Sequence, residues 1–256
     1  MHKQAHMEFL PLFHNVRGKL CVVVGGDETA WRKIQWLLKA GALVTVVSDT
    51  ILPVVNAAVT EAGGQCIPCD TSDTDMLTEI LAGVFSDCSL VIGATDDAEC
   101  NMLVSALAQM HNIPVNIVDC PELCSFIFPS IVERGLLTVA VSTGGNAPVM
   151  ARLIRAKIES WLPVQLTTMI AVVGAIREPI RELLPTTRTR MRFWDSVLQD
   201  SLLSTASDTV MAFTETTLLQ KASVFKTQQQ AGCVDTIHLD SIESDHLRFF
   251  QLRLLQ

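Results

Sequence analysis

Short runs of β-branched residues alternate with longer amphipathic segments over the first half of the chain. In order, these runs and segments cover residues 20–24, 30–40, 43–47, 51–62, 65–67, 75–82, 90–94, 99–111 and 115–118. A short apolar run is typical of a buried strand, and a longer run with apolar positions three and four residues apart is typical of a helix. Because a parallel strand pair needs a crossover connection, strands that alternate with helices indicate a parallel sheet. The pattern therefore predicts an α/β fold with a doubly wound parallel sheet.

The pattern changes after residue 119. Residues 125–131 and 136–141 predict a pair of strands joined by the polar turn Glu133-Arg134-Gly135. A two-stranded ribbon is only marginally stable alone. We therefore expect this small dimerisation β region to pair with a second copy and form a homodimer.

The last part of the chain has the periodicity of helices. Residues 147–161 place Val149 and Leu153 on one face of an amphipathic helix. Residues 164–221 predict two or three further helices, broken near Pro179 and Pro185, and residues 228–232 resemble a linker. The fold class is thus a parallel sheet followed by a small β region and a helical C-terminal portion.

A glycine-rich loop follows the first predicted strand and opens a helix. Its sequence, Val24-Gly25-Gly26-Asp27-Glu28-Thr29-Ala30, stands where a G-x-G-x-x-G/A dinucleotide fingerprint is expected, so the sheet is Rossmann-like. Gly25 permits the tight turn and Ala30 permits close helix packing, but Asp27 replaces the glycine that lets backbone approach a pyrophosphate. A carboxylate there repels the phosphates and is expected to weaken NAD binding. The loop leaves two alternatives open, a working NAD site and a Rossmann-like scaffold with an empty one.

Asp49 follows the second predicted strand. A carboxylate at this place binds a ribose 2′-hydroxyl and repels a 2′-phosphate. We therefore expect NAD rather than NADP, if a dinucleotide binds.

Composition narrows the class of protein. The net charge of −8 without a basic run argues against a nucleic-acid surface. The mean hydropathy of +0.35 is high, but the most apolar stretch, residues 169–176, is far shorter than the about 20 residues of a membrane span. The polar N-terminus lacks the apolar segment of a secretory signal. We expect a cytoplasmic protein with no membrane partner, whose cysteines are reduced and packed as small apolar groups rather than bound to zinc.

Residues 8 to about 220 resemble the N-terminal half of sirohaem synthase, the precorrin-2 dehydrogenase and sirohydrochlorin ferrochelatase family. The resemblance lies in the order and spacing of several segments taken together. They are Leu10-Pro-Leu-Phe13, the Val24–Ala30 loop with Arg32-Lys33, Ala94-Thr-Asp-Asp97 with Asn101, Asn116-Ile-Val-Asp119, Ser125-Phe-Ile-Phe-Pro-Ser-Ile131, Ala140-Val-Ser-Thr-Gly-Gly145, Pro148-Val-Met-Ala-Arg152 and Arg192-Phe-Trp194.

The resemblance implies a division of the chain and a chemistry. It implies a Rossmann-like NAD-binding domain over residues 1–118, a dimerisation region over 119–148 and a helical domain over 149–228. The implied activity is the NAD-dependent oxidation of precorrin-2 to sirohydrochlorin, followed by insertion of ferrous iron. Asp119 corresponds to the family residue held central to both steps, as the catalytic base and as a transient ligand of the iron.

Further residues of the chain acquire roles through the same resemblance. The cofactor is expected at Gly25, Gly26, Glu28, Thr29, Asp49 and Thr50, and the tetrapyrrole substrate at Asn116, Ser142, Thr143, Gly144 and Arg152. The loop before the Ala147 helix places amides and hydroxyls where they suit a propionate or acetate group. Thr143 stands where some relatives have a phosphorylatable serine. A plain turn and N-cap remains the alternative for this loop, and a capping role remains the alternative for Asp119.

Three functions remain open at this point. The first is the bifunctional enzyme, the second a chelatase or tetrapyrrole-binding protein that has lost hydride transfer through Asp27, and the third a dimeric scaffold without catalysis. Residues 232–256 resemble the first strand and helix of the uroporphyrinogen methyltransferase domain, so residues 229–256 are read as a remnant of it. The remnant lacks that family's glycine-rich loop, and we expect no methyltransferase activity.

Overall fold

The computed structural model describes residues 9–203 and 213–230. The chain divides into two compact units, which we call the sheet unit (Met1–Ile131 and Ala140–Lys157) and the helical unit (Val132–Val139 and Ile158–Gln256). The remnant predicted over residues 229–256 lies outside the described residues beyond position 230.

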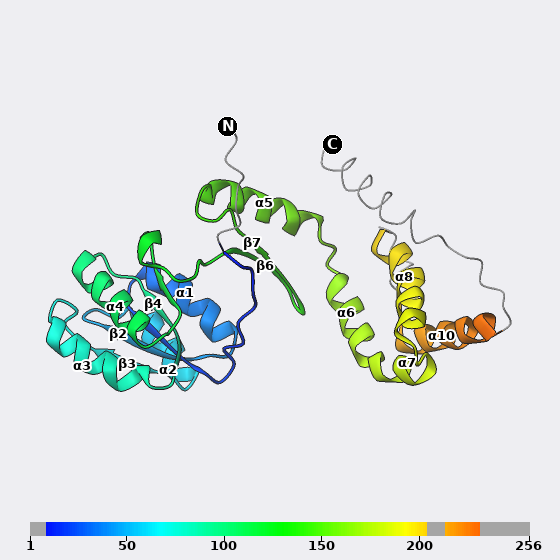
Figure 1. The fold of residues 1–256 in the computed structure, drawn as a ribbon, viewed down its shortest axis with the longest axis horizontal. Helices are drawn as coiled ribbons and strands as arrows, with labels where there is room; N and C mark the ends of the chain where they lie inside the picture. Colours follow the sequence, from blue (N-terminus) through cyan, green and yellow to red (C-terminus); the bar gives the residue numbers. More distant parts are fainter. Residues whose placement is uncertain (1–8, 204–212, 231–256) are drawn as a thin grey trace. The chain divides into compact units, whose positions relative to one another are not determined.

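The sheet unit is built on five parallel strands in the order β3-β2-β1-β4-β5 (Figure 1). The strands are β1 (Leu20–Val24), β2 (Leu43–Ser48), β3 (Gln65–Pro68), β4 (Cys88–Gly93) and β5 (Val115–Ile117). The helices between them are α1 (Glu28–Lys39), α2 (Pro53–Glu61), α3 (Thr74–Phe85) and α4 (Ala98–Met110). The predicted α/β class and parallel sheet are confirmed. The strand order reverses between β1 and β4, because β2 and β3 lie on one side of β1 and the later strands lie on the other. Ligands of such sheets bind beyond the carboxyl ends of the strands at this switch point.

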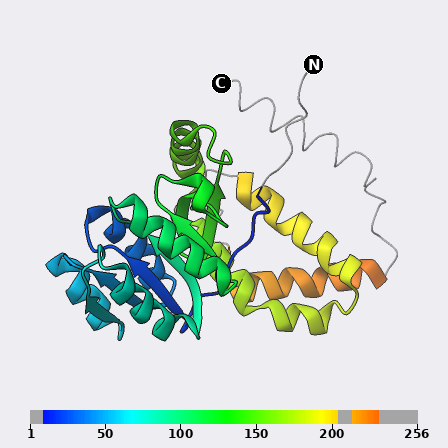
Figure 2. The same ribbon diagram turned by 60° about the vertical axis from the view of Figure 1, so that its left-hand side comes forward.

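Both faces of this sheet are covered by helices (Figure 2). Side chains of β1 alternate between the two faces: Val23 packs with α1 and α2, and Val22 and Val24 pack with α3 and α4. A strand buried on both faces has no polar side, which is why the strand runs are almost continuously apolar. Aspartates cap three of the helices: Asp27, Asp73 and Asp97 each accept a hydrogen bond from an amide in the first turn.

The β ribbon begins later than the sequence predicts. Its strands are β6 (Ser130–Arg134) and β7 (Leu137–Val141), so the turn falls at Gly135 and Leu136, and the prediction of a strand from residue 125 is wrong. The Ser125 amide instead donates to the Val115 carbonyl of β5 at 2.8 Å, and the Ser125 hydroxyl accepts from the Val115 amide at 2.8 Å. Phe126 and Phe128 pack against the core on the α1 side of the sheet. These contacts hold the segment against the sheet unit.

The remaining helices are α5 (Pro148–Trp161), α6 (Leu166–Ala175), α7 (Arg177–Leu183), α8 (Thr187–Leu203) and α10 (Glu215–Gln230). Phe193, Ile176, Ile180 and Leu218 lie at the centre of the helical unit's core. The predicted break at Pro185 falls between α7 and α8, whereas Pro179 lies in the first turn of α7, where a missing amide costs no hydrogen bond. The predicted linker at 228–232 is wrong in its first residues, because α10 continues to Gln230.

Candidate functional site at the carboxyl edge of the sheet

The loops after β1, β2, β4 and β5 lie together at one edge of the sheet, which we call the carboxyl edge (residues 25–30, 49–52, 94–97 and 118–120). Parallel strands end on the same side, so residues far apart in sequence meet there. All six residues that the sequence assigns to the cofactor, together with Asp119, lie in these segments.

Gly25 and Gly26 are required by the protein's own backbone. Gly25 has φ +118°, and a Cβ atom there would lie 2.2 Å from the Ala94 carbonyl oxygen. A Cβ atom on Gly26 would lie 2.4 Å from the Thr50 carbonyl oxygen. The Gly25 amide donates to the Val47 carbonyl at 2.9 Å, and the Gly26 carbonyl accepts from Leu52 at 3.0 Å. The β1 loop is therefore fixed between the loops that follow β2 and β4.

Asp27 adopts ordinary extended backbone and caps α1. Its Oδ1 accepts a hydrogen bond from the Ala30 amide at 2.9 Å. One of the amides that a pyrophosphate would use is thus taken by a carboxylate of the chain itself. The structure records no acceptor within residues 9–203 and 213–230 for the amides of Glu28 and Thr29. The α1 N-terminus therefore offers a bound phosphate two amides rather than three.

Asp49 and Thr50 follow β2 at the same edge, and both are exposed. The Ser48 hydroxyl orders this loop through bonds to Asp49 Oδ1 at 3.3 Å and the Thr50 carbonyl at 3.0 Å. An open pocket of about 530 Å³ adjoins it, lined by Asp49, Pro68, Cys69, Asp70 and Met76. Two carboxylates in one pocket repel a phosphate group, so the pocket suits an uncharged ribose better than a phosphorylated one.

The loop after β4 is held by a buried amide. Asn101 of α4 is 4% exposed, and its Nδ2 donates to the Thr95 carbonyl at 2.8 Å. The Thr95 hydroxyl donates back to Asn101 Oδ1 at 3.0 Å. The pair fixes the position of Ala94, whose carbonyl oxygen limits residue 25 to glycine.

Asp119 lies just beyond β5, at the carboxyl edge, and it is exposed. Its φ of 58° is in the left-handed region, which aspartate and asparagine tolerate better than most residues. Flanking backbone bonds hold this conformation: Val118 donates to the Gly93 carbonyl at 2.9 Å and Cys120 to the Ile117 carbonyl at 3.4 Å. The position suits a residue that reaches a ligand, while its catalytic role stays a prediction.

Lys33 of α1 was given no role by the sequence, although it belongs to a segment that carries the family resemblance. Its ammonium lies 4.5 Å from the centre of the Phe128 ring, a cation–π contact. Burial lowers the pKa of Lys33, and its electrostatic interactions with Asp119 and Cys124 oppose that change. Lys33 is therefore a half-buried cation that interacts electrostatically with Asp119 without an ion pair between them. The signal was hard to find in the sequence because Phe128 and Asp119 are remote from residue 33 along the chain.

Asn116 is buried and uses its side chain inside the protein. Its Nδ2 donates to the Phe126 carbonyl at 3.0 Å and contacts Cys124 Sγ at 3.5 Å. The Cys124 thiol also accepts from the Ile117 amide at 3.1 Å, and burial is the main reason that its pKa is raised. These contacts fasten the segment after Asp119 to β5, which gives Asn116 a positioning role. These internal contacts account for the Asn116 side chain, and its contact with substrate stays a prediction.

The loop between β7 and α5 has local contacts. The Ser142 hydroxyl accepts from the Gly144 amide at 3.0 Å, and the Thr143 hydroxyl accepts from the Ala147 amide at 3.1 Å. Gly144 has φ +62°, as a turn requires. These bonds are those of the turn and N-cap alternative. Arg152 is exposed on α5, and the binding roles of all these residues stay predictions.

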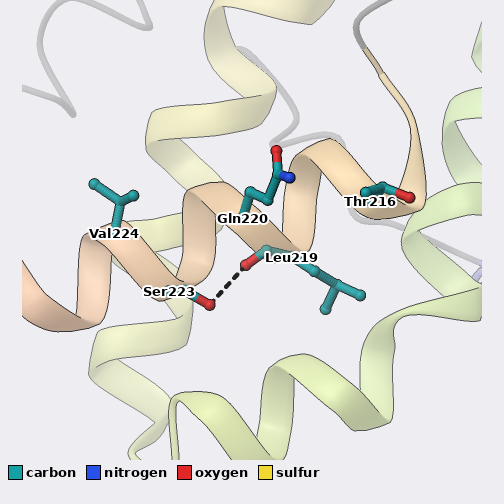
Figure 3. A pocket seen from close by; sticks show the side chains of 5 residues that line it. All are labelled: Thr216, Leu219, Gln220, Ser223 and Val224. Carbon is teal, nitrogen blue, oxygen red and sulfur yellow. Dashed lines mark hydrogen bonds between the residues drawn. The ribbon is translucent and has the colours of Figure 1, made fainter.

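Other parts of the described chain hold no comparable cluster. An open pocket of about 660 Å³ on α10 is lined by Thr216, Leu219, Gln220, Ser223 and Val224, none of them charged, and the Ser223 hydroxyl bonds to the Leu219 carbonyl (Figure 3). Within residues 9–203 and 213–230 no three His, Cys, Asp or Glu side chains are grouped to hold a metal ion. No single helix of the described chain is long and apolar enough to cross a membrane, and α5 with α6 qualifies only as a bent pair.

The strand order and the glycine loop define a Rossmann-type protein of the NAD(P)-binding class. Residues 12–130 match the family model described as "Putative NAD(P)-binding". Residues 134–160 match "Sirohaem biosynthesis protein central", and residues 165–218 match "Sirohaem synthase dimerisation region". The chain belongs to the sirohaem synthase family and corresponds to its N-terminal region, which confirms the resemblance inferred from the sequence.

Curated relatives and one solved structure agree with this assignment. The chain is 39% identical over 250 residues to the siroheme synthase of Pseudomonas paraeruginosa and 39% identical over 253 residues to that of Azotobacter vinelandii. Each alignment covers 98% of this chain and 52% of the relative, so the chain spans about half the length of these relatives. The solved structure of SirC, a precorrin-2 dehydrogenase, matches 86% of this chain and all of its own with a TM-score of 0.60. At 17% identity this last likeness bears on the fold.

Proposed function

We propose that this chain is an NAD-dependent precorrin-2 dehydrogenase that also inserts ferrous iron into sirohydrochlorin. The observation that carries the proposal is the exposed carboxylate of Asp119 at the carboxyl end of β5, on the same sheet edge as the dinucleotide loop. A carboxylate beside a hydride-acceptor site is the arrangement that oxidation of a C–H bond with loss of a proton requires. A cytoplasmic location is proposed with it, since the described cysteines are free thiols.

The residues of the edge fit NAD. The amides of Glu28 and Thr29 at the α1 N-terminus suit the pyrophosphate, and Asp49 suits a ribose hydroxyl. Gly25, Gly26 and Thr50 shape the loop through their backbone contacts. NAD, when bound, supplies the hydride acceptor for the oxidation. The acidic pocket beside Asp49 favours NAD over NADP.

Asp119 has a role in both proposed reactions. In the oxidation its carboxylate accepts the proton that leaves the macrocycle as the hydride departs. In iron insertion two pyrrole protons are lost as ferrous iron, a substrate here, enters the ring. The same carboxylate accepts one proton or guides the cation. Asn116 and Cys124 hold the adjoining segment so that Asp119 keeps its place.

Asp27 favours a second candidate function, a chelatase or tetrapyrrole-binding protein without hydride transfer. Its carboxylate occupies the Ala30 amide and adds negative charge where the phosphates approach. The two functions differ in whether NAD binds with useful affinity. The helix dipole contributes only about 0.3–1 kcal/mol toward offsetting the repulsion.

Asp27→Gly tests the cofactor directly. We expect the KM for NAD to fall about 10-fold, which corresponds to about 1.4 kcal/mol, because the carboxylate is removed and the Ala30 amide is released. The measurement is NADH formation from precorrin-2 at varied NAD. Thr186→Gly, which removes the side-chain cap of α8 in the helical unit, is the control. If the natural protein forms no NADH and only Asp27→Gly does, the result supports the second candidate function, a chelatase or tetrapyrrole-binding protein without hydride transfer. An unchanged KM contradicts the role given to Asp27.

The proposed substrate contacts lie on the β7–α5 loop and on α5. Tetrapyrroles of this pathway carry acetate and propionate groups, which suit the arginine fork of Arg152 and the hydroxyls of Ser142 and Thr143. The Gly144 amide already has an acceptor in Ser142, and the Ala147 amide has one in Thr143. A substrate carboxylate therefore has to displace these local bonds.

We also propose a homodimer, and α5 supplies a test of it. Val149, Met150 and Leu153 are 60%, 53% and 57% exposed and lie on one side of the helix. Met150→Glu is expected to raise the dimer dissociation constant at least about 10-fold, because a carboxylate is costly in an apolar interface. Light scattering after gel filtration measures it. Met102→Glu, at a methionine of α4 that is 51% exposed, is the matched control. Equal behaviour of both variants would exclude α5 from the interface.

A further inference from the structure

The ammonium of Lys33 contacts an aromatic ring and forms no ion pair with the residues that the structure describes. Lys33 lies in the second turn of α1 and is half-buried, and its ammonium rests 4.5 Å from the centre of the Phe128 ring. No ion pair of Lys33 is recorded within residues 9–203 and 213–230. Phe128 is itself packed on the core, so the ring is a fixed support. The ring face occupies one side of an ammonium group that has three donors.

Burial makes the charged form of Lys33 unfavourable, and the surrounding protein compensates for this only in part. Burial disfavours the charged form and lowers the pKa of Lys33, while Asp119 and Cys124 act in the opposite direction. Asp119 acts across a separation longer than an ion pair, because no contact within 4.0 Å is recorded between them. A partly desolvated cation that forms no ion pair with a carboxylate of the described residues is suited to receive an anion from a ligand.

Another lysine of the same helix shows that Lys33 is unusual. The ammonium of Lys39 lies 5.5 Å from the Trp36 ring, so it too stacks on an aromatic side chain. Lys39, however, is exposed in the last turn of α1, where water and the helix dipole favour a cation. Lys33 has less contact with water and lies nearer the positive end of the helix dipole, so both effects favour its charge less. The two lysines therefore differ in their burial and in their place along α1, with Lys33 nearer to the carboxyl edge.

We infer that Lys33 binds a carboxylate of the tetrapyrrole beside Asp119, so that the macrocycle is held where Asp119 reaches it. The inference rests on the proposed function and adds a substrate-binding residue to it. Phe128 orients the ammonium, which pairs with an acetate or propionate group of the substrate. The pyrophosphate of NAD is the other anion of the site, but the α1 N-terminus that binds it lies more than one helical turn before Lys33.

The test compares Lys33→Met, Lys33→Arg and Lys39→Met in the full chain. Methionine keeps an unbranched apolar stem against Phe128 and removes the charge. We expect Lys33→Met to raise the KM for precorrin-2 and the dissociation constant of sirohydrochlorin, followed by its absorbance, about 10-fold. The kcat and the KM for NAD are expected to change less than about two-fold. Lys33→Arg should recover most of the binding, and Lys39→Met should match the natural protein.

The outcomes separate this inference from the proposed function. Natural protein that neither binds sirohydrochlorin nor forms NADH overturns both. Natural protein that binds it, with an unchanged dissociation constant in Lys33→Met, overturns the role of Lys33 alone. If only the KM for NAD rises, Lys33 serves the cofactor. If kcat falls without a change in KM, Lys33 acts through Asp119. Either result overturns the inference. Thermal unfolding of each variant identifies losses of binding that are due to misfolding. If Lys33→Met misfolds, the binding of sirohydrochlorin by Lys33→Arg, which keeps the charge, tests the inference instead.

Discussion

Asp119→Asn is expected to lower NADH formation from precorrin-2 by about 10²- to 10⁴-fold, the usual contribution of a positioned general base. Asparagine has nearly the same shape as aspartate and also tolerates the left-handed conformation, with φ of 58°, that residue 119 adopts. The fold and the substrate KM should therefore change little. Insertion of ferrous iron into sirohydrochlorin should slow as well, because the same carboxylate accepts a proton in that step. Steady-state kinetics with each substrate measures both effects.

Asp96→Asn is the matched control for this loss. Asp96 is an exposed carboxylate in the loop after the neighbouring strand β4. Removing its charge changes the electrostatic field of the same edge without removing the proposed base. Similar losses in the two variants would mean that the edge needs negative charge in general, and the specific role of Asp119 would be wrong. A loss in the oxidation alone would assign iron insertion to other groups.

The strands and helices of the sheet unit are predictable from sequence because each is a local pattern. β1 and β2 are buried on both faces, so their runs are almost continuously apolar, and α1 to α4 show helical periodicity. The segment after Asp119 is different. Its alternation of Phe126 and Phe128 resembles a strand, yet those rings pack on the core while Ser125 bonds to β5. That choice depends on contacts with residues distant in the sequence, which a local pattern does not contain.

The candidate site divides in the same way. The fingerprint predicts a tight loop at Gly25 and a disturbed phosphate site at Asp27, and the structure places Asp27 as the cap of α1. The fingerprint explains glycines by the approach of a cofactor. In this chain Gly25 and Gly26 are also required by Ala94 and Thr50, backbone neighbours that only the folded chain brings near. Lys33 went unassigned for the same reason.

Gly25→Ala is expected to lower the free energy of unfolding by about 3 kcal/mol or more. A φ of +118° is unfavourable for any residue with a Cβ atom, and this Cβ would lie 2.2 Å from the Ala94 carbonyl oxygen, so the loops after β1 and β4 have to separate.

Gly63→Ala at the end of α2 is the control that separates the cost of the positive φ from the cost of the steric clash. Gly63 also has a positive φ, +80°, but a Cβ there meets nothing within 4 Å, and the expected loss is about 1 kcal/mol. Urea unfolding followed by circular dichroism compares the variants. The excess loss in Gly25→Ala measures the contact between the two loops, and equal losses would show that the β4 loop moves aside freely. That result would contradict a carboxyl edge preformed for NAD, because the same contact fixes the loop on which the cofactor is proposed to bind.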